Sequence, residues 1–474
     1  MPRMGEDNLF DSDGTRPRPG GPRPGGFESW RQPAGTAQFE FGFRIFHAMT
    51  PRGMDASEVT APPRPSQWEL AGDAGRAWAM LALLATAELL GMSPWFTGSA
   101  VAPELVARWT LSDAQVGGLS TAVQLGFVLG TALAALLNLA DVIPARRYFT
   151  YAATAAAVAN AALVWTPDYG AALVTRALTG FCLAGVYPPA MKMAATWFRA
   201  RRGLAVGAVV GALTVGKAAP YLWRVLPDAG VETIVFASSA AAAVAAILVA
   251  LLWRDGPFAF PSRRFSWGLV GEVFAAPRWR LATGGYLGHM AELYAYWTWI
   301  PAFVAASAVA WASDPVAARS PWVGALSFGT IAVGGLGCVW GGIVSDRVGR
   351  ERLVILAMAL SGLCALAIGF AFGRSPWILA PLALAWGFFV IADSAQFSVL
   401  VTESVPPHAV GTALTVQVCL GFLLTTITIQ MIPPLVAWAG WRAAFALLAV
   451  GPALGILSIR RLQAHTENGR EGSV

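Results

Sequence analysis

Two glutamates stand inside long apolar segments of this sequence, where a carboxyl group is expensive to keep. Glu88 lies in "ATAELLGMSPWF" and Glu292 in "AELYAYWTWI", each about twelve residues after an arginine, Arg76 or Arg280. At 1.5 Å per helical residue, this spacing corresponds to a depth of about 18 Å, and the midplane of a bilayer core lies ~15 Å deep. A charge there costs at least ~2.5–3.5 kcal/mol. Each acid therefore needs a cavity, a partner or a proton.

The segment around Glu292 adds further groups that can exchange protons. Tyr286, His289, Glu292 and Tyr296 are spaced by three, three and four residues, so they share one face of a helix. Histidine changes charge near neutral pH, and a carboxyl group removed from water tends to keep its proton. The pattern predicts either a cavity wall with a His–Glu proton relay or structural hydrogen bonds to a neighbouring helix.

Glu88 is followed by a methionine and a tryptophan at helical spacing. Glu88, Met92 and Trp95 are four and three residues apart, which places them on one helix face. We expect Glu88 to face the interior of the helical bundle. Trp95 either lines a cavity or anchors its helix at the membrane interface, where tryptophan is enriched.

Basic residues are also placed at depth. Lys217, about fifteen residues past Arg202, either binds an anionic substrate or neutralises one of the buried acids, because an unpaired cation is costly in hydrocarbon. Arg176, about eight residues into its apolar segment, is a second candidate for a functional cation. The only other lysine, Lys192, is expected at the membrane interface, where its side chain can reach water.

Two further segments suggest broken helices or coupling groups. In "GVYPPAM", Pro188 and Pro189 should interrupt the helix and free backbone carbonyls, which makes Tyr187 a plausible cavity contact. In "IADSAQF", Asp393 either pairs with a loop or serves in coupling. The runs "GAVVG" (207–211) and "GGLG" (334–337) predict close helix packing rather than ligand binding.

The composition indicates whether these residues belong to a soluble protein or to a membrane protein. The chain has 474 residues, 56% hydrophobic and 13% charged, with a mean hydropathy of +0.56. Soluble proteins carry about a quarter charged residues. Repeated apolar runs of 18 residues or more predict a polytopic membrane protein. The net charge of +6 then reflects loop arginines, and we expect no nucleic-acid partner. The four cysteines lack metal-ligand spacing and are expected as free thiols.

About twelve membrane spans are predicted. They cover residues 78–101, 114–138, 147–165, 169–195, 203–223, 231–253, 281–304, 322–344, 353–372, 376–400, 409–433 and 440–459. The loops on one side carry two or more arginines each and those on the other about one, which predicts two cytosolic termini in a cell inner membrane. Residues 1–72, rich in Pro, Gly and Arg, are expected to form a disordered cytosolic extension, unless translation begins at Met49 or Met54.

The second half of the apolar region repeats the first. Glu88 corresponds to Glu292, Asp141 to Asp346 and Gly180 to Gly387, at offsets of 204, 205 and 207 residues. This predicts an all-α membrane protein with two pseudo-symmetric six-helix halves and a site between them. The predicted domains are an N-terminal bundle (76–253), a central cytosolic loop (254–280), a C-terminal bundle (281–461) and a cytosolic tail (462–474).

One loop of the second half carries a family resemblance. "GGIVSDRVGRERL" (341–353) is similar to the G-x-x-x-D-R-x-G-R loop of the major facilitator superfamily, and "RALTG" (176–180) resembles that family's helix 4 signature. The first-half copy, "LLNLADVIPARRYF", has Leu137 and Pro144 where the family has glycine. The resemblance implies alternating access between two halves and gating roles for the matching residues, which are Asp141, Arg146, Gly342, Asp346, Arg347, Gly349 and Arg350.

These observations predict a proton-coupled secondary transporter, a symporter of a small solute and most simply of an organic or inorganic anion. The alternatives are proton-driven efflux of drugs or metabolites and a transporter-like sensor. We expect no enzyme, because no metal cluster, nucleophile motif or P-loop occurs. No cofactor is expected, and the partners should be the substrate, protons and the lipid bilayer around a monomer.

Overall fold

The computed structural model of this chain describes residues 74–198, 202–226, 229–258 and 265–471. The predicted extension 1–72, with both alternative start sites, lies outside the described residues. So does the side chain of Asp141, although its backbone belongs to a short helix.

The described chain is helical and contains no strand in these ranges. The helices of the first half are α3 (Ala74–Gly91), α4 (Thr97–Ala100), α5 (Ala102–Trp109), α6 (Asp113–Leu136), α7 (Leu139–Val142), α8 (Ala145–Ala161), α9 (Tyr169–Leu183), α10 (Tyr187–Trp197), α11 (Arg202–Trp223) and α12 (Val231–Leu252). The later helices are α13 (Val270–Ala275), α14 (Pro277–Ala312), α15 (Pro321–Ala332), α16 (Gly334–Val348), α17 (Arg350–Ala367), α18 (Pro376–Ala392), α19 (Ser394–Thr402), α20 (Val410–Ala439), α21 (Trp441–Ala444) and α22 (Val450–Glu471).

Ten stretches of the described chain are helices long and apolar enough to cross a membrane. The two remaining predicted spans coincide with α3 and with α8, which has 17 residues and continues into a single 3-10 turn. An all-α membrane fold is therefore confirmed, and the count of twelve spans stays a prediction. Helix starts follow local chemistry: α6 begins at a capping box in which Ser112 and Gln115 satisfy each other's backbone N–H groups.

Several spans are broken near their middle. α3 ends at Gly91 and α4 begins at Thr97, with Pro94 in the intervening turn. The predicted break at Pro188 is present, because α9 ends at Leu183 and α10 begins at Tyr187. A further break separates α18 from α19 at Asp393. Such breaks are tolerated inside a membrane protein only where other groups satisfy the freed backbone.

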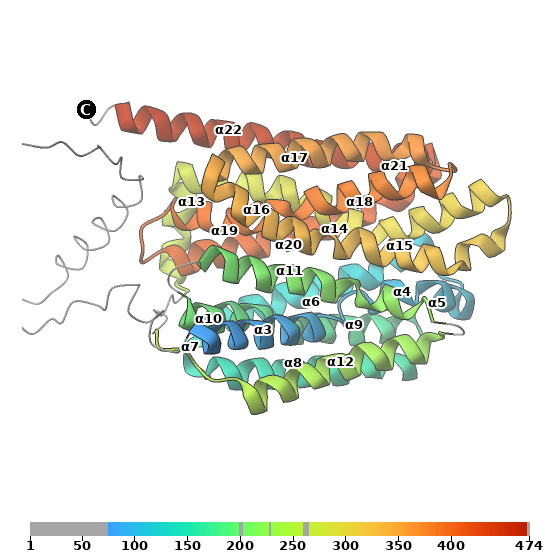
Figure 1. Cartoon of the computed structure of the whole chain (residues 1–474), viewed down its shortest axis with the longest axis horizontal. Helices are drawn as coiled ribbons and strands as arrows, with labels where there is room; N and C mark the ends of the chain where they lie inside the picture. The colour runs from blue at the N-terminus through green and yellow to red at the C-terminus, as the bar shows by residue number, and fades with distance from the viewer. Residues whose placement is uncertain (1–73, 199–201, 227–228, 259–264, 472–474) are drawn as a thin grey trace, which may run out of the picture. The chain divides into compact units, whose positions relative to one another are not determined.

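Helices from the two halves of the chain pack directly on one another. α6 lies against α20, and α11 lies against α15 and α16; in Figure 1 the green α11 runs beside the yellow and orange helices of the second half. A Cβ atom added at Gly211 of α11 would lie 2.9 Å from the carbonyl oxygen of Gly335 of α16. The predicted small-residue runs "GAVVG" and "GGLG" are therefore confirmed as a close helix contact, and they face each other.

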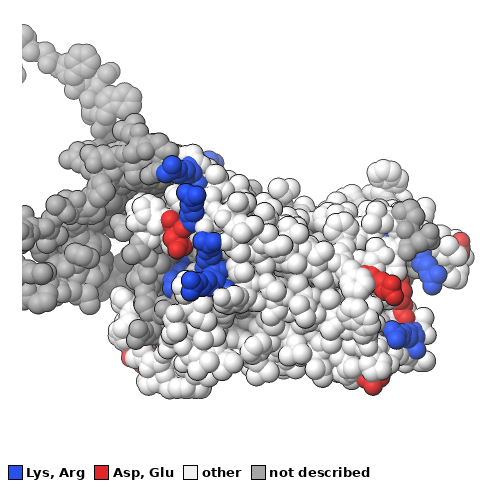
Figure 2. Space-filling view, turned by 90° about the horizontal axis from the view of Figure 1, so that it is seen from below, with Lys and Arg blue, Asp and Glu red and all other residues white. Residues whose placement is uncertain are grey.

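The surface is sorted as a bilayer requires. On the face shown in Figure 2, charged side chains of the described residues gather at the two ends, and the broad belt between them is uncharged. Apolar side chains such as Leu129, Val158 and Leu251 are exposed. Large tryptophans, among them Trp377 and Trp438, are also exposed, as expected for rings at a membrane interface.

The contact between α6 and α9 gives a stability prediction. A Cβ atom added at Gly180 would lie 2.0 Å from the carbonyl oxygen of Val123, a backbone atom that cannot move away alone. We expect Gly180→Ala to force the helices apart and to destabilise the fold by roughly 1–3 kcal/mol. Gly271→Ala is the matched control, because nothing lies within 4 Å of its Cβ position. Melting temperatures in detergent should fall for the first variant only; equal values would contradict the tight contact.

Candidate functional site

A buried lysine that no carboxylate of the described residues contacts directly lies where the two halves meet. The side chain of Lys217, on α11, is 3% exposed, and its Nζ donates a hydrogen bond of 2.6 Å to Tyr294 Oη on α14. The same Nζ lies 4.0 Å from the ring centroid of Trp95 and 5.5 Å from that of Trp297. The ammonium is thus stabilised by the negative faces of aromatic rings and by one hydroxyl group.

Close backbone packing brings Lys217 to this place. A Cβ atom at the preceding Gly216 would lie 2.1 Å from the carbonyl oxygen of Leu89 on α3. The backbones of α11 and α3 therefore touch here, and only glycine allows this approach. The contact places the lysine beside the turn that carries Trp95.

Three rings face the ammonium, and two phenylalanine rings pack against them. We call these rings, which come from both halves, the aromatic cluster: Trp95, Phe127, Tyr294, Trp297 and Phe422. They come from the α3–α4 turn, α6, α14 and α20. Ring centroids of Phe127 and Phe422 are 4.6 Å apart, and Tyr294 lies 5.2 Å from Phe422. Trp95 contacts Phe127, Tyr294 and Phe422 within 6 Å. The cluster joins the first half to the second around one charge.

Glu88 is a buried acid whose carboxyl group is available to bind a proton or a ligand. It is fully buried on α3, and neither carboxyl oxygen has a hydrogen-bond partner in the described chain. It attracts Lys217 electrostatically, and it also acts on Tyr187, but no hydrogen bond joins it to either residue. A buried carboxyl group without donors costs free energy, so Glu88 requires a proton or a donor from a bound molecule.

Arg176 is buried as well, but its donors are already used by the protein. Its Nη1 donates to Asn160 Oδ1 at 2.7 Å, and its Nη2 donates to the carbonyl oxygens of Pro94 and Trp95 at 2.8 and 2.7 Å. Those carbonyls belong to the broken turn between α3 and α4. The guanidinium therefore holds the turn that carries Trp95, and only its Nε lacks a partner.

The predicted face of α14 is buried, but its residues have other partners than the sequence suggested. His289 Nδ1 lies 2.9 Å from Asp393 Oδ1, and both side chains are about 1% exposed. Glu292 Oε1 accepts hydrogen bonds of 2.7 Å from Ser361 Oγ and Trp386 Nε1. The structure therefore does not show the expected His–Glu contact, because Asp393 at the α18–α19 break lies closer to the imidazole.

The two tyrosines of that face are also held within the second half. Tyr296 donates to the carbonyl oxygen of Ala383 at 2.9 Å and stacks on Trp386 with 4.1 Å between ring centroids. Tyr286 packs against Gly421 of α20, where a Cβ would lie 2.3 Å from its ring. Tyr294, two residues before Tyr296, is the residue that reaches Lys217.

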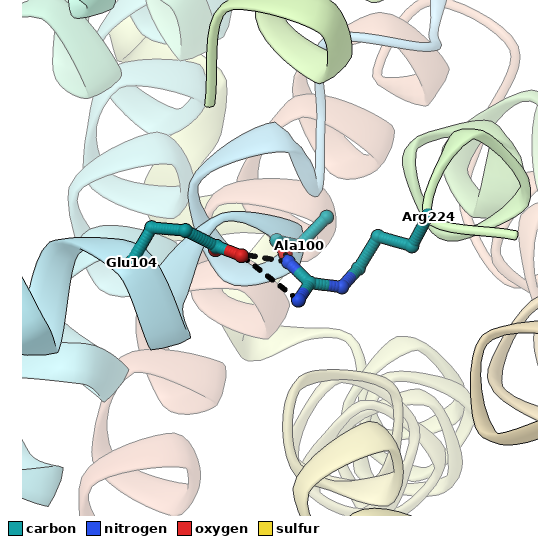
Figure 3. Close-up of polar contacts among 3 residues, drawn as sticks. All are labelled: Ala100, Glu104 and Arg224. Carbon is teal, nitrogen blue, oxygen red and sulfur yellow. Dashed lines mark hydrogen bonds and ion pairs between the residues drawn. The ribbon is translucent and has the colours of Figure 1, made fainter. Parts of the chain in front are cut away.

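One end of the bundle is closed by a contact between the two halves. A Cβ at Gly117 of α6 would lie 3.0 Å from the ring of Trp299 on α14. Within the second half, Trp299 Nε1 donates to the carbonyl oxygen of Ile429 on α20 at 2.8 Å. At the same end, Arg224 forms a forked ion pair with Glu104 at 2.9 and 3.0 Å and also donates to the carbonyl of Ala100 (Figure 3). This pair ties α11 to the segment after α3.

The predicted gating residues lie at the opposite end, at the arginine-rich turns. Arg350 Nη1 lies 2.7 Å from Glu403 Oε1, just after α19. Gly349 has φ +92°, which favours glycine. Arg146 donates to the carbonyl oxygen of Ala250. The other second-half candidates occupy the end of α16, where Gly342 is half-buried and Asp346 and Arg347 are exposed.

A polytopic helical membrane transporter is the class that this fold and this site define, since the buried charged site draws residues from both halves of a membrane bundle. The family model described as Major Facilitator Superfamily matches residues 83–429. The chain belongs to this superfamily, as the loop resemblance predicted.

Solved structures agree on the fold. A bacterial homolog to the human lysosomal transporter Spinster, in an inward-facing and unoccupied conformation, is similar with a TM-score of 0.62 and 15% identity, over 82% of this chain and 98% of that one. The nucleoside transporter NupG, in a mutant form, is similar with a TM-score of 0.63 and 14% identity, over 81% of this chain and 99% of that one. No curated protein sequence matches the chain.

Proposed function

We propose that this protein is a secondary active transporter that moves a small organic anion together with protons, with Lys217 at the centre of the substrate site. The observation that carries the proposal is a buried ammonium, at the contact between the halves, that is held by ring faces and one hydroxyl group instead of a carboxylate. Glu88 attracts Lys217 electrostatically but forms no hydrogen bond with it in the described chain, so an anion that enters this site gains a direct contact with the ammonium that no carboxylate makes.

The walls of the site favour an organic anion over an inorganic one. Sulfate and phosphate are strongly hydrated, and inorganic oxyanions in general are bound by several polar donors. Here the surroundings of Lys217 are the faces of Trp95, Tyr294 and Trp297, which stabilise a flat apolar body by stacking. A planar organic anion satisfies both the charge and the rings.

The proposed cycle is alternating access between the two six-helix halves, in a monomer with both termini in the cytosol of a cell inner membrane. The aromatic cluster and the close approach of Trp299 to Gly117 join the two halves, and they support closure of the side that carries Arg224 in the present state. Arg350 and Glu403 belong to the opposite, arginine-rich end, which we assign to the cytosol. Access of substrate from the first side requires the cluster to part.

Purified protein in proteoliposomes tests this function. The probes are benzoate, benzenesulfonate, nitrate, sulfate and the cationic dye ethidium, with an interior pH dye and protein-free liposomes for passive leak. Benzenesulfonate does not cross lipid as a neutral acid, so its uptake with interior acidification reports protein-mediated symport. We expect uptake of the flat organic anions only. Preference for nitrate or sulfate, export of ethidium, or no anion uptake by folded protein would each contradict the proposal.

A further inference from the structure

The two broken spans α9–α10 and α18–α19 are equivalent in the repeat, but only one break carries charge. The offset of 207 residues that relates Gly180 to Gly387 places Val186 opposite Asp393, and both positions lie at the helix breaks. The offset of 204 residues places Ala85 opposite His289. The first half thus has an apolar pair where the second half has a histidine and an aspartate, so the pair is not required by the fold.

The geometry of this pair suits proton binding. His289 Nδ1 lies 2.9 Å from Asp393 Oδ1, within ion-pair distance, but neither this oxygen nor the buried Nε2 has a hydrogen-bond partner in the described chain. In a neutral imidazole one ring nitrogen carries the proton and the other keeps a lone pair that can accept one. With a neutral imidazole the pair carries one buried negative charge. A proton added at Nε2 gives an imidazolium–carboxylate pair with no net charge, which an apolar interior favours.

The groups described below, which lie around His289 and Asp393, are acidic or neutral. Glu292, from the same helix as His289, acts electrostatically on Asp393, and so does the thiol of Cys338 on α16. The rings of Phe397 and Tyr286 pack against the imidazole at 5.2 and 6.3 Å. Glu292 already accepts two hydrogen bonds, whereas His289 Nε2 and Asp393 Oδ1 have no hydrogen-bond partner in the described chain, so the open proton-accepting positions belong to this pair.

A short helix connects the pair to the arginine-rich loop. α19 spans nine residues; Asp393 precedes its first residue, and Glu403, which holds Arg350, follows its last. Next to the break, a Cβ at Gly341 of α16 would lie 1.9 Å from the carbonyl oxygen of Ala392. α19 itself packs against both α16 and α17. A shift of α19 therefore acts on both helices that flank the loop, because α16 ends and α17 begins there.

We propose that His289 and Asp393 bind the coupled proton, and that α19 transmits the charge of this pair to the loop between α16 and α17. The unprotonated pair, with its net negative charge, favours a displaced α19 and a different loop position; protonation holds α19 where it is seen here. The inference rests on the proposed function only for the statement that the bound proton is transported. The link between the pair and the loop stands without any substrate.

The link is tested with spin labels on the two arginine-rich turns. Exposed Val142 and Val348 are replaced by labelled cysteines after the four native cysteines are changed to alanine, and distances are measured from about pH 5 to about pH 8, the range in which histidine titrates. We expect a pH-dependent change in the distance distribution. His289→Asn, which keeps a donor near Nδ1 but cannot titrate, should abolish the change, and so should Asp393→Asn. Glu292→Gln is the matched control and should keep it.

The outcomes separate this inference from the proposed function. A pH response unchanged in His289→Asn and in a second variant, His289→Gln, would overturn the inference, as would a wild-type protein with no response. In proteoliposomes, His289→Asn should still carry benzenesulfonate down its gradient but with at least a tenfold smaller proton flux per anion. If wild type carries no anion while the pH response depends on His289, the proposed function fails and the inference holds. If wild type carries the anion and His289→Asn remains fully coupled, the proposed function holds and the assignment of the transported proton to this pair fails.

Discussion

Replacement of Lys217 by methionine should abolish anion uptake while leaving the protein at least as stable as wild type. The two effects have one cause. Removing one partner of a buried charge pair costs about 2–5 kcal/mol of binding free energy, which corresponds to a loss of apparent affinity of roughly 30-fold to several thousand-fold. Without substrate, however, Lys217 is a buried cation that no carboxylate of the described residues contacts directly. Glu88 attracts it only at a distance and can take up a proton once the cation is gone, so we expect an apolar side chain of similar length to be neutral or stabilising at this site.

Two variants make this result specific. Lys192→Met removes the only other lysine, which lies on α10 outside the aromatic cluster, and should keep at least half of the uptake. Lys217→Arg keeps the charge but not the compact shape that fits between Trp95 and Tyr294, so uptake should fall without vanishing. Uptake is measured with the anion panel described above. The melting temperature of each variant is measured in detergent. A Lys217→Met protein that transports normally, or that loses activity because it unfolds, would refute the assignment.

The fold was predictable to the extent that it follows from regular patterns. The apolar runs predicted helices of membrane length, and Pro188 marked the break in the fourth predicted span, because proline lacks an N–H and disrupts the preceding turn. The break at Asp393 has no proline nearby. Its position is still implied by the 207-residue offset, since a repeat tends to conserve backbone geometry even where side chains differ. A proline in one half can therefore indicate a break in the other half.

The site was harder to predict because α14 is buried on nearly all sides. Periodicity identifies which residues share a face, but it indicates the inward face only when the other face meets a different solvent. Leu293, Tyr294, Tyr296 and Trp297 are all buried, so the sequence could not show that Tyr294 contacts Lys217 and that Tyr296 faces α18. Likewise, depth identified Asp393 as unusual, but only the packed helices show that His289 is its partner.

Arg176 shows a different limit, because its acceptors are backbone atoms. A buried arginine usually directs attention to acidic side chains, and none is bonded to it here. The carbonyls of Pro94 and Trp95 lie at the α3–α4 break, where the regular helical hydrogen bonds are interrupted. Pro94 O accepts only a long bond of 3.3 Å from Thr97 N, and the guanidinium adds the shorter bonds to both carbonyls. The "SPWF" sequence was the available signal. Arg176 is therefore expected to act on substrate binding only through the position of Trp95 above Lys217.

Arg176→Gln should destabilise the protein strongly, since it removes the guanidinium that donates to the carbonyls of Pro94 and Trp95 and to the amide oxygen of Asn160. Hydrogen bonds inside membrane proteins average about 0.6 kcal/mol, whereas bonds to charged groups in soluble proteins contribute about 1.5–3 kcal/mol. Three bonds then give a loss of roughly 2–9 kcal/mol in unfolding free energy. Arg108→Gln, at an exposed position of α5, should change it by less than about 0.5 kcal/mol.

Denaturant unfolding in detergent measures the unfolding free energy of Arg176→Gln and of its control, Arg108→Gln. Anion uptake by the folded fraction then decides whether Arg176 acts through the turn or contacts the substrate directly. If Arg176 braces the turn, stability falls first, and the affinity of the folded fraction for benzenesulfonate falls with it because Trp95 is displaced from Lys217. If Arg176→Gln is as stable as wild type yet inactive, the guanidinium instead contacts substrate or protons directly. In that case the carbonyls at the break have other partners during transport, and the open state of the site includes Arg176.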